Sequence, residues 1–289
     1  MADGLESEFL TEAQVKALNE LAVEAGKVIM TIYAEPFEAL DKSDGSPVTK
    51  ADGAAEAIIL QGLSNLFPGI PVVAEEAVEA GDLPSAGDRY FLVDPLDGTK
   101  EFLKKNGEFT VNIALIENGV PVFGVVAAPA LDEVFWGGCW ATGGEARQQA
   151  FKGTISGPEI TTVTPISVRA APAAGLSVLA SRSHLSEETA ALIDQLNVAE
   201  RLSVGSSLKL CWVAAGRADL YPRLAPTMQW DIAAGDAVVR AAGGSVVYAD
   251  TGKDFVYKIP ENPTKDDLRN PYFIAVSDKV LLPDPVPAM

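Results

Sequence analysis

Hydrophobic residues recur at helical spacing in two stretches near the start of the chain. In Glu12–Tyr33 they follow one another three or four positions apart, and Thr11 stands where a helix N-cap is expected. After the turn-rich segment DKSDGSPV, the same spacing returns in AAEAIILQGLSNLF, which follows Thr49 and Asp52 and stops at Pro68-Gly69. The pattern predicts two amphipathic helices.

Apolar runs of strand length replace this spacing in the following segment. IPVVAEE and FLVD are short apolar stretches, and TVNIALI and VPVFGVVAAP are separated by Asn118-Gly119, a strong hairpin signal. EVFWGGCW is a further strand candidate. These runs predict a sheet whose strands are mainly antiparallel.

Strands and helices alternate from about Leu176. The candidates are SVLAS, SEETAALIDQLN, a strand near Arg201, SLKLCWVAAG, ADLYPR, WDIAAGDAVVRAAGG, VVYAD and YFIAVS. Such alternation indicates an α/β arrangement. Because the chain has neither internal repeats nor a long linker, we expect two halves, residues 1–165 and 166–289, packed around a shared cleft.

Composition narrows the classes of partner. The 289 residues are 48% hydrophobic, which suffices for a sizeable core. With 40 acidic and 22 basic residues, the net charge is −18. A nucleic acid polymer is therefore not an expected partner, since binding one needs clustered cations. A small anionic substrate could still bind where bound metal ions reverse the local field.

The sequence has few features that indicate a cellular compartment. Cys139 and Cys211 are the only cysteines and have no metal-binding spacing, so both are interpreted as buried thiols. The acidic N-terminus is unlike a signal peptide, and no apolar run is long enough to span a bilayer. We expect a cytoplasmic protein without an integral membrane segment.

Two carboxylates in the segment FLVDPLDGTKEFLKK are the first candidates for chemistry. Asp94 ends an apolar strand, and Asp97 follows three positions later, after Pro95. One interpretation is structural: an Asp-Pro turn, with Asp97 or Thr99 capping the next helix. On these residues alone, that interpretation is as good as a catalytic one.

Further acids at the ends of elements favour chemistry. Glu75-Glu76 ends an apolar strand, while Asp52 and Asp231 lie at helix starts. A single acid there is usually a cap or a partner of the helix dipole. Brought together, they would repel one another unless divalent cations bind, and a set of oxygen ligands favours Mg²⁺. Paired carboxylates can hold two metals about 3.5–4 Å apart, an arrangement used in phosphoryl transfer.

Gly98 and Thr99 suit a phosphate. The N-terminus of the helix that follows offers free N–H groups, and Gly98 allows close approach of the backbone. The Thr99 hydroxyl could orient a water near the metals, or it could simply be an N-cap.

Three motifs in this order resemble the inositol monophosphatase-like superfamily of metal-dependent, lithium-sensitive phosphatases. They are Glu75-Glu76, DPLDGT from Asp94 to Thr99, and WDIAAGDAVVRAAGG from Trp230 to Gly244. The resemblance implies an α/β fold, a layered αβαβα sandwich. Its N-terminal half would carry a mainly antiparallel sheet and the metal site, and its C-terminal α/β half would bind substrate. Residues 147–165 match no part of the family pattern.

Within that superfamily, three details resemble the bacterial 3'(2'),5'-bisphosphate nucleotidase branch. They are KEF after DGT, NGEFTVNIALI, and GSSLKLCWVAAGRADLYPR. The branch removes the 3'-phosphate of adenosine 3',5'-bisphosphate (PAP) to give AMP and phosphate. Removal of the 3'-phosphate from PAPS, the sulfated precursor, is a second implied reaction.

Residue roles also follow from the resemblance. It implies two or three Mg²⁺ ions, held by Glu75, Asp94, the Leu96 carbonyl, Asp97 and Asp231. Asp52 and Thr99 would activate the attacking water with help from Glu75. Gly98 and Thr99 would hold the scissile phosphate. The residues that would face the nucleotide are His184, Ser206, Lys209 and Arg223.

Each of the last four has a simpler explanation. His184 is the only histidine, and a lone histidine is more often a surface or capping residue than a ligand. Lys209 could snorkel from an apolar helix, Arg223 could be a surface charge, and Ser206 could cap the helix that it precedes.

Two alternative functions remain open at this stage. The same chemistry could act on an inositol phosphate or another small sugar or alcohol phosphate. The chain could also be a non-catalytic sensor of nucleotide or metal, although all the predicted ligands are present. The sequence leaves open whether two copies form a homodimer.

Overall fold

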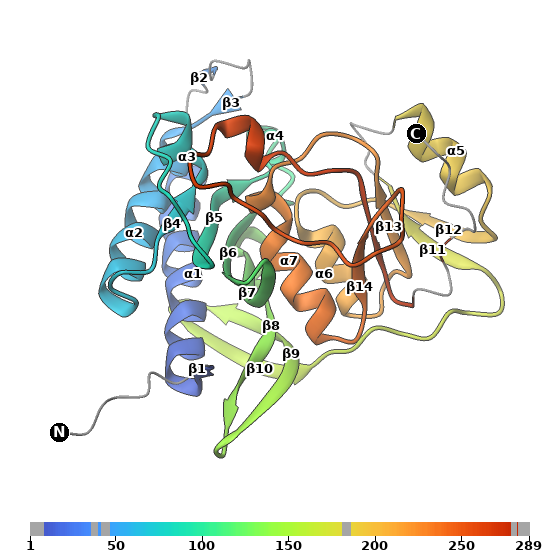
Figure 1. Cartoon of the computed structure of the whole chain (residues 1–289), viewed down its shortest axis with the longest axis horizontal. Coiled ribbons are helices and arrows are strands. Elements are labelled where there is room, and N and C mark those ends of the chain that lie inside the picture. The colour runs from blue at the N-terminus through green and yellow to red at the C-terminus, as the bar shows by residue number, and fades with distance from the viewer. Residues whose placement is uncertain (1–8, 36–39, 42–46, 181–185, 279–281, 283–289) are drawn as a thin grey trace.

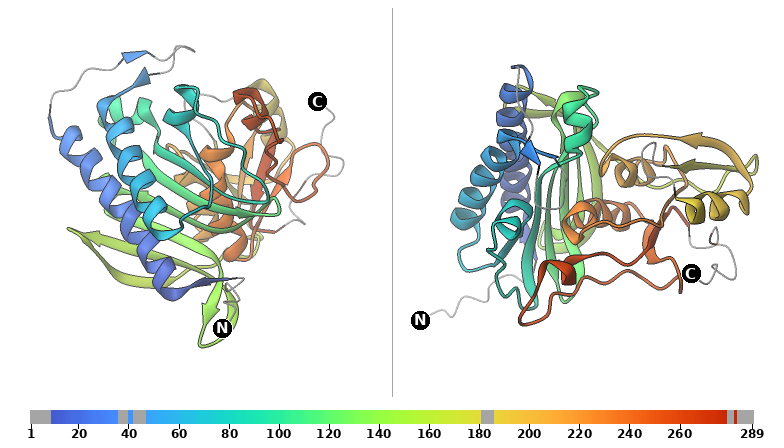
Figure 2. Two further views of the ribbon diagram at one scale, coloured as in Figure 1. Left: turned by 60° about the vertical axis from the view of Figure 1, so that its left-hand side comes forward. Right: turned by 90° about the horizontal axis from the view of Figure 1, so that it is seen from above.

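The protein is a five-layered α/β sandwich, seen edge-on in Figure 2. The computed structural model describes residues 9–35, 40–41, 47–180, 186–278 and 282. Two helices, a first sheet, two further helices, a second sheet and a last helix follow one another across the molecule (Figure 1). The predicted αβαβα sandwich is confirmed. Among the described residues, no helix is both long enough and apolar enough to cross a membrane.

The first sheet has eight strands in the order β10-β9-β8-β7-β6-β5-β4, with β1 added beside β8. All pairs are antiparallel except β4 with β5 and β1 with β8. The strands are β1 (Leu10–Thr11), β4 (Val72–Ala74), β5 (Arg89–Asp97), β6 (Thr110–Glu117), β7 (Val120–Ala128), β8 (Glu133–Thr142), β9 (Glu145–Ser156) and β10 (Glu159–Pro165). The predicted hairpin joins β6 and β7, and Asn118 and Gly119 both have positive φ, 50° and 78°, as a tight turn of this kind requires.

Helices α1 (Glu12–Tyr33) and α2 (Lys50–Leu66) cover one face of this sheet. Helix α1 begins after Thr11, the predicted N-cap, whereas α2 begins after Thr49, four residues before the predicted AAEAIILQGLSNLF; each start has a capping box. A small antiparallel pair, β2 (Leu40–Asp41) and β3 (Pro47–Val48), precedes α2 in the segment predicted to be turn-rich.

Helices α6 (Leu208–Ala214) and α7 (Gln229–Ala241) cover the opposite face. The α7 backbone comes very close to β7, since a Cβ at Gly124 would lie 2.3 Å from the Ala234 oxygen. Buried side chains of β5 alternate between the two faces. Phe91 and Val93 join the core under α1 and α2, while Tyr90 and Leu92 join the core under α7. Burial on both faces explains the uninterrupted apolar run of this strand.

The second sheet has five strands in the order β12-β11-β13-β15-β14. They are β11 (Leu176–Leu179), β12 (Val198–Leu202), β13 (Leu220–Arg223), β14 (Ser245–Tyr248) and β15 (Phe273–Val276). Leu192 and Ile193 of α5 (Glu187–Asp194) pack in one core cluster with Val178 and Ile274 of this sheet. The predicted alternation of strands and helices in this half is confirmed.

Several elements differ from the sequence prediction. Glu75 and Glu76 do not end a strand but begin the short helix α3 (Glu75–Glu79). Two 3₁₀ helices, η1 (Pro129–Leu131) and η2 (Lys265–Leu268), were not predicted, and residues 147–165 supply most of β9 and β10. The division at residue 165 stays a prediction. All strands of the first sheet precede it, although α7, from the second half, packs on that sheet.

Candidate active site

Asp94 and Asp97 lie on either side of an irregularity in strand β5 and not in a plain turn. Asp94 pairs with Asn112 and Asp97 with Thr110, so β5 fits one extra residue into the interval. The interpretation of Asp94-Pro95 as a turn is therefore wrong, because strand β5 continues through Asp97. The end of this strand contacts the second half of the molecule, since the Ser207 amide donates to Asp97.

Gly98 begins the helix α4 (Thr99–Leu103). Its φ of 96° is in the left-handed region, and an added Cβ would lie 3.2 Å from the Glu108 oxygen. The alternative that Asp97 or Thr99 caps this helix is wrong, since the cap residue is Gly98 and α4 has no side-chain cap. Both side chains are thus available for other contacts.

The structure brings Thr99 and Asp52 together. The Thr99 Oγ1 lies 3.4 Å from Asp52 Oδ1 and 3.4 Å from the Leu96 carbonyl oxygen. The other carboxylate oxygen of Asp52 accepts hydrogen bonds from the Thr49 amide at 2.8 Å and the Thr49 hydroxyl at 2.7 Å. Asp52 therefore closes the capping box of α2 with one oxygen and faces Thr99 with the other.

Four predicted metal ligands affect one another electrostatically. Burial, followed by the charges of Glu75, Asp97 and Asp231, raises the pKa of Asp94 well above its usual range. Burial and the charges of Asp97 and Glu75 likewise raise the pKa of Asp231. These carboxylates come from α3, β5 and α7, three separate elements. The fold therefore gathers them, as the sequence predicts.

The oxygen ligands of this cluster are of the type that binds a metal ion, but their side chains do not yet surround one ion position. Among the described residues, no three Asp, Glu, His or Cys side chains already surround a common ion position. The carboxylates are turned instead toward donors of the protein: Asp94 Oδ1 accepts from the Leu96 amide at 3.0 Å, and Asp231 Oδ2 from the Met228 amide at 2.8 Å. Buried oxygen ligands that repel one another suit a hard divalent cation, which would draw them together.

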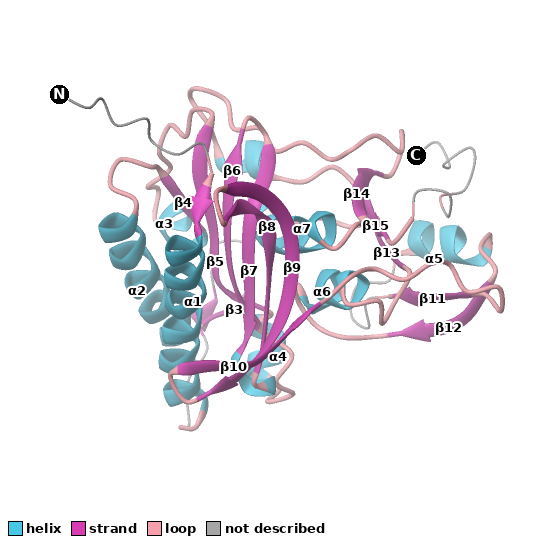
Figure 3. Ribbon diagram, turned by 90° about the horizontal axis from the view of Figure 1, so that it is seen from below, coloured by secondary structure: helices cyan, strands magenta, loops and turns pink. Residues whose placement is uncertain are grey.

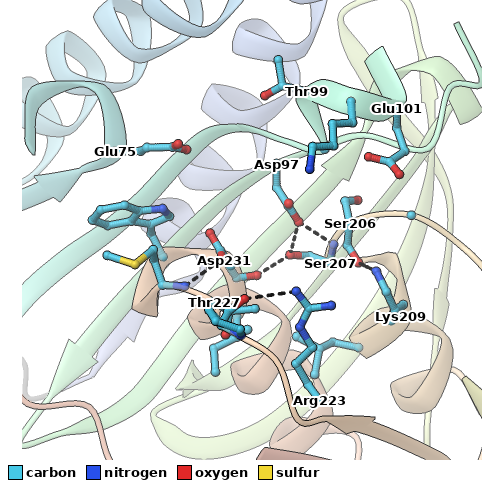
Figure 4. A pocket seen from close by; sticks show the side chains of 18 of the residues that line it. Glu75, Asp97, Thr99, Glu101, Ser206, Ser207, Lys209, Arg223, Thr227 and Asp231 are labelled. Carbon is cyan, nitrogen blue, oxygen red and sulfur yellow. Dashed lines mark hydrogen bonds between the residues drawn. The ribbon is translucent and has the colours of Figure 1, made fainter. Parts of the chain in front are cut away.

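Ser207 is a site residue that the sequence prediction missed. Its amide donates to Asp97 Oδ2 at 2.7 Å, and its Oγ lies 3.0 Å from the same oxygen and 2.6 Å from the Asp231 carbonyl oxygen (Figure 4). Asn112 Nδ2 donates to this hydroxyl at 2.9 Å. Ser207 thus ties both aspartates to the start of α6. The sequence placed Ser206 in this region, and nothing in GSSLKL distinguishes the two serines.

A cavity of about 570 Å³ opens beside these carboxylates. The predicted residues that line it are Glu75, Asp97, Gly98, Thr99, Ser206, Lys209, Arg223 and Asp231. Asp52 and Asp94 are each 1% exposed and, like Leu96, do not line it. His184 lies outside the described residues. The cavity is therefore lined by acidic side chains, and Lys209 and Arg223 lie near Asp97 and Asp231 in it (Figure 4).

Lys209 is buried in the wall of the cavity. Its Nζ donates to the Ser206 carbonyl at 2.8 Å and lies 5.5 Å from the centroid of the Tyr221 ring. Burial lowers the pKa of Lys209 to about 8, although the Asp97 charge opposes the shift. A snorkelling role is therefore wrong. The alternative that Ser206 caps α6 is also wrong, because the cap residue is Ser207 and Ser206 has a φ of 46°.

Arg223 also belongs to the cavity. Its Nη2 donates to the Pro226 carbonyl at 3.1 Å, and its Nε is buried without a hydrogen-bond partner. An ordinary surface charge is thus a poor description. Three further cations, Lys100, Lys265 and Arg269, also line the cavity and were not predicted to belong to the site. Lys265 of the short red helix η2 forms an ion pair with Glu79 of α3, and this pair joins the two helices beside the cavity (Figure 1).

The fold and the acidic cleft define the class of protein. Residues 11–283 match the inositol monophosphatase family, and the chain belongs to that family. Enzymes of this family are metal-dependent and generally use Mg²⁺.

Similarity to individual proteins is more specific than the family match. The chain is 44% identical over 259 residues to the 3'(2'),5'-bisphosphate nucleotidase CysQ of Salmonella typhimurium, covering 88% of this chain and 96% of the relative. It is 30% identical to the protein of the same name from Haemophilus influenzae, covering 90% and 91%. The crystal structure of CysQ from Bacteroides thetaiotaomicron superposes with a TM-score of 0.73 at 38% identity, covering 92% and 97% of the two chains.

A related solved structure carries the family name. The inositol monophosphatase TM1415 of Thermotoga maritima superposes with a TM-score of 0.68 at 27% identity, covering 92% of both chains. The predicted family is therefore confirmed.

Proposed function

We propose that this protein is a Mg²⁺-dependent 3'(2'),5'-bisphosphate nucleotidase, which hydrolyses the 3'-phosphate of PAP to give AMP and phosphate. PAPS would be converted to APS by the same reaction. The observation that carries the proposal is the cavity itself, which is lined both by the acidic residues Asp97 and Asp231 and by the cations Lys209 and Arg223. Similarity to 3'(2'),5'-bisphosphate nucleotidases at up to 45% identity supports the choice of substrate.

The residues that would hold two or three Mg²⁺ ions are Glu75, Asp94, the Leu96 carbonyl, Asp97 and Asp231. Their buried, mutually repelling oxygens suit that ion. The chemistry that Mg²⁺ supplies when bound is neutralisation of charge on the phosphate oxygens and a lower pKa for a water.

Thr99 and Asp52 would orient the attacking water. In the 3.4 Å contact, the Thr99 hydroxyl donates to Asp52, so its oxygen is free to accept a proton of a water beside it. The Asp52 carboxylate can then receive the proton that Thr99 passes on, with Glu75 assisting. Such contacts are often long before substrate binds and shorten in the complex. Gly98 and Thr99 would hold the scissile phosphate with their backbone N–H groups.

The cations of the cavity would bind the rest of the nucleotide. Lys209 and Arg223 would meet the remaining 5'-phosphate or the sugar, and Ser206 and His184 would also face the nucleotide. A second anionic group on the substrate would account for the two cations, Lys209 and Arg223, among the residues that line the cavity. An inositol monophosphate has no such group.

The experiment that tests this function compares phosphate release from PAP and from inositol 1-phosphate at matched concentrations, with Mg²⁺ and with an EDTA control. Strong preference for PAP, lost with EDTA, is the expected result. Preference for inositol 1-phosphate would keep the metal site and move the function to the sugar phosphatases. Binding of PAP without phosphate release would favour the sensor alternative. The homodimer and the cytoplasmic location stay predictions.

A further inference from the structure

A second cavity, of about 490 Å³, lies between the first turns of α1 and the strands β8 and β10. It shares no lining residue with the active-site cavity. Figure 3 shows β10 and β8 beside α1 at this end of the sheet. Trp136 and Trp140 of β8, which are 7% and 4% exposed, line it together with Val15 of α1 and Ile160 and Val163 of β10. An apolar hollow of this size is within the range of small-molecule sites.

Asn19 provides a polar group in this apolar lining. Its side chain is only 4% exposed, and its Oδ1 has no hydrogen-bond partner. Most buried acceptors in proteins are paired, so an unpaired one needs an explanation. Val15, Lys16 and Asn19 follow one another at helical spacing and line the same hollow. The Asn19 oxygen itself has almost no accessible surface, so a donor in the hollow reaches it only when the amide turns toward the hollow.

The charges around this hollow favour a cation. Glu12, Glu20 and Glu159 line it, and Lys16 is the single cation among the lining residues. The Lys16 Nζ lies 2.6 Å from Glu20 Oε1, so its charge is offset by one of the three carboxylates. The other two carboxylates add to the attraction exerted by a chain of net charge −18.

We propose that this hollow is a binding site for a small amphipathic amine, distinct from the active site. The apolar part of the ligand packs on Trp136 and Trp140, and its ammonium group faces Glu12 and Glu159 and donates to Asn19 Oδ1 once that amide has turned toward the hollow. Tryptophan rings also attract a nearby cation through their faces. The site is independent of the proposed nucleotidase function, because none of these residues touches the active-site cavity.

The test uses full-length protein labelled with ¹⁵N at the tryptophan indoles, titrated with 2-phenylethylamine. The four indole signals are assigned from single Trp→Phe variants. The signals of Trp136 and Trp140 are expected to shift saturably, while those of Trp212 and Trp230 stay in place. The matched anion, 3-phenylpropionate, is expected to bind at least tenfold more weakly at the same ionic strength.

Variants separate a ligand site from a chance hollow. Asn19→Leu keeps the size of the side chain and is expected to weaken the amine at least tenfold, whereas Asn65→Leu on exposed α2 surface leaves it unchanged. Glu12→Gln with Glu159→Gln, two rim changes that leave the core intact, should weaken it at least threefold. Absence of saturable shifts, equal binding of amine and anion, or unchanged binding in both the Asn19 and the rim variants would each overturn the proposal. PAP hydrolysis in these variants is expected to match the unmodified protein.

Discussion

The hydroxyl of Thr99 lies 3.4 Å from the carboxylate of Asp52, although 47 residues separate them in the sequence. The contact joins the first turn of α4 to the first turn of α2, and the capping box of α2 fixes Asp52 from its other side. Asp52 thus has a conventional structural role and also faces Thr99, with which we propose that it activates the attacking water. Because Asp52 makes both contacts, the sequence pattern alone could not decide between a helix cap and the proposed catalytic role.

Removing the Thr99 hydroxyl should reduce turnover without unfolding the protein. Thr99→Val keeps the β-branched shape and is expected to lower kcat about 10²–10³-fold, the scale of a lost proton-transfer contact. Steady-state kinetics with PAP and Mg²⁺ measure the effect. Thr99→Ser, which keeps the hydroxyl, should retain most of the activity. Full activity in the valine variant would show that Thr99 does not act on the water.

The acidic cluster should make stability depend on pH and Mg²⁺ together. In the folded protein the pKa values of Asp94 and Asp231 are raised above the usual 3.8, mainly by burial and then by neighbouring carboxylates. Their stabilising contribution is therefore complete below pH 3.8 and is lost as the pH rises through the raised values. Mg²⁺ compensates for this loss, so it should raise Tm more at pH 7.5 than at pH 5. Thermal unfolding at both pH values, with Mg²⁺ or EDTA, measures the difference.

Asp94→Asn is the matched variant for that experiment. It removes one charge from the cluster, so without Mg²⁺ its Tm should be higher than that of the unmodified protein by about 2–4 °C, which corresponds to ~1 kcal/mol. Turnover should be abolished while the fold survives. Wild-type activity in the folded variant would contradict the metal role of Asp94, and a larger Mg²⁺ effect at pH 5 would contradict the electrostatic argument.

Ser207 is expected to position the metal ligands. Ser207→Ala removes the hydroxyl that lies between Asp97 and the Asp231 carbonyl, while the amide contact with Asp97 remains. Loss of such an outer contact typically weakens metal affinity about tenfold or more. Activity titrated against Mg²⁺ should show this shift, with a smaller effect on kcat at saturating Mg²⁺.

Ser206→Ala is the control for Ser207, because its hydroxyl contacts Thr110 and no carboxylate. It should leave the Mg²⁺ dependence unchanged. Equal Mg²⁺ dependence in both variants would assign Ser207 a purely structural role.

Lys209 should give substrate binding a pH dependence near 8. Its pKa is lowered to about 8, mainly by burial, so its positive charge is present below that pH and lost above it. KM for PAP is therefore expected to rise between pH 7 and 9, whereas Lys209→Arg, which stays charged, should flatten the profile. A KM profile unchanged by the arginine substitution would remove Lys209 from the phosphate site.

Periodicity and the N-cap signal predicted α1 to the residue and α2 to within four residues of its start, because both helices satisfy their first turns with local side chains. Local sequence patterns could not identify site residues whose role depends on contacts between the two halves of the chain. Ser207 is identifiable only once Asp97 lies beside it, 110 residues away in the sequence. Likewise, α4 begins at the left-handed Gly98 and not at the expected caps, directly after a strand irregularity that local patterns did not indicate.

The alternating burial of β5 has a consequence for how the protein unfolds. One strand contributes Phe91 and Val93 to one core and Tyr90 and Leu92 to the other, and it ends in the carboxylates of the cleft. Neither core can open without exposing half of this strand. Loss of either core therefore removes the support of the acidic cluster, so the amides of β5 should exchange with solvent only when the whole protein unfolds.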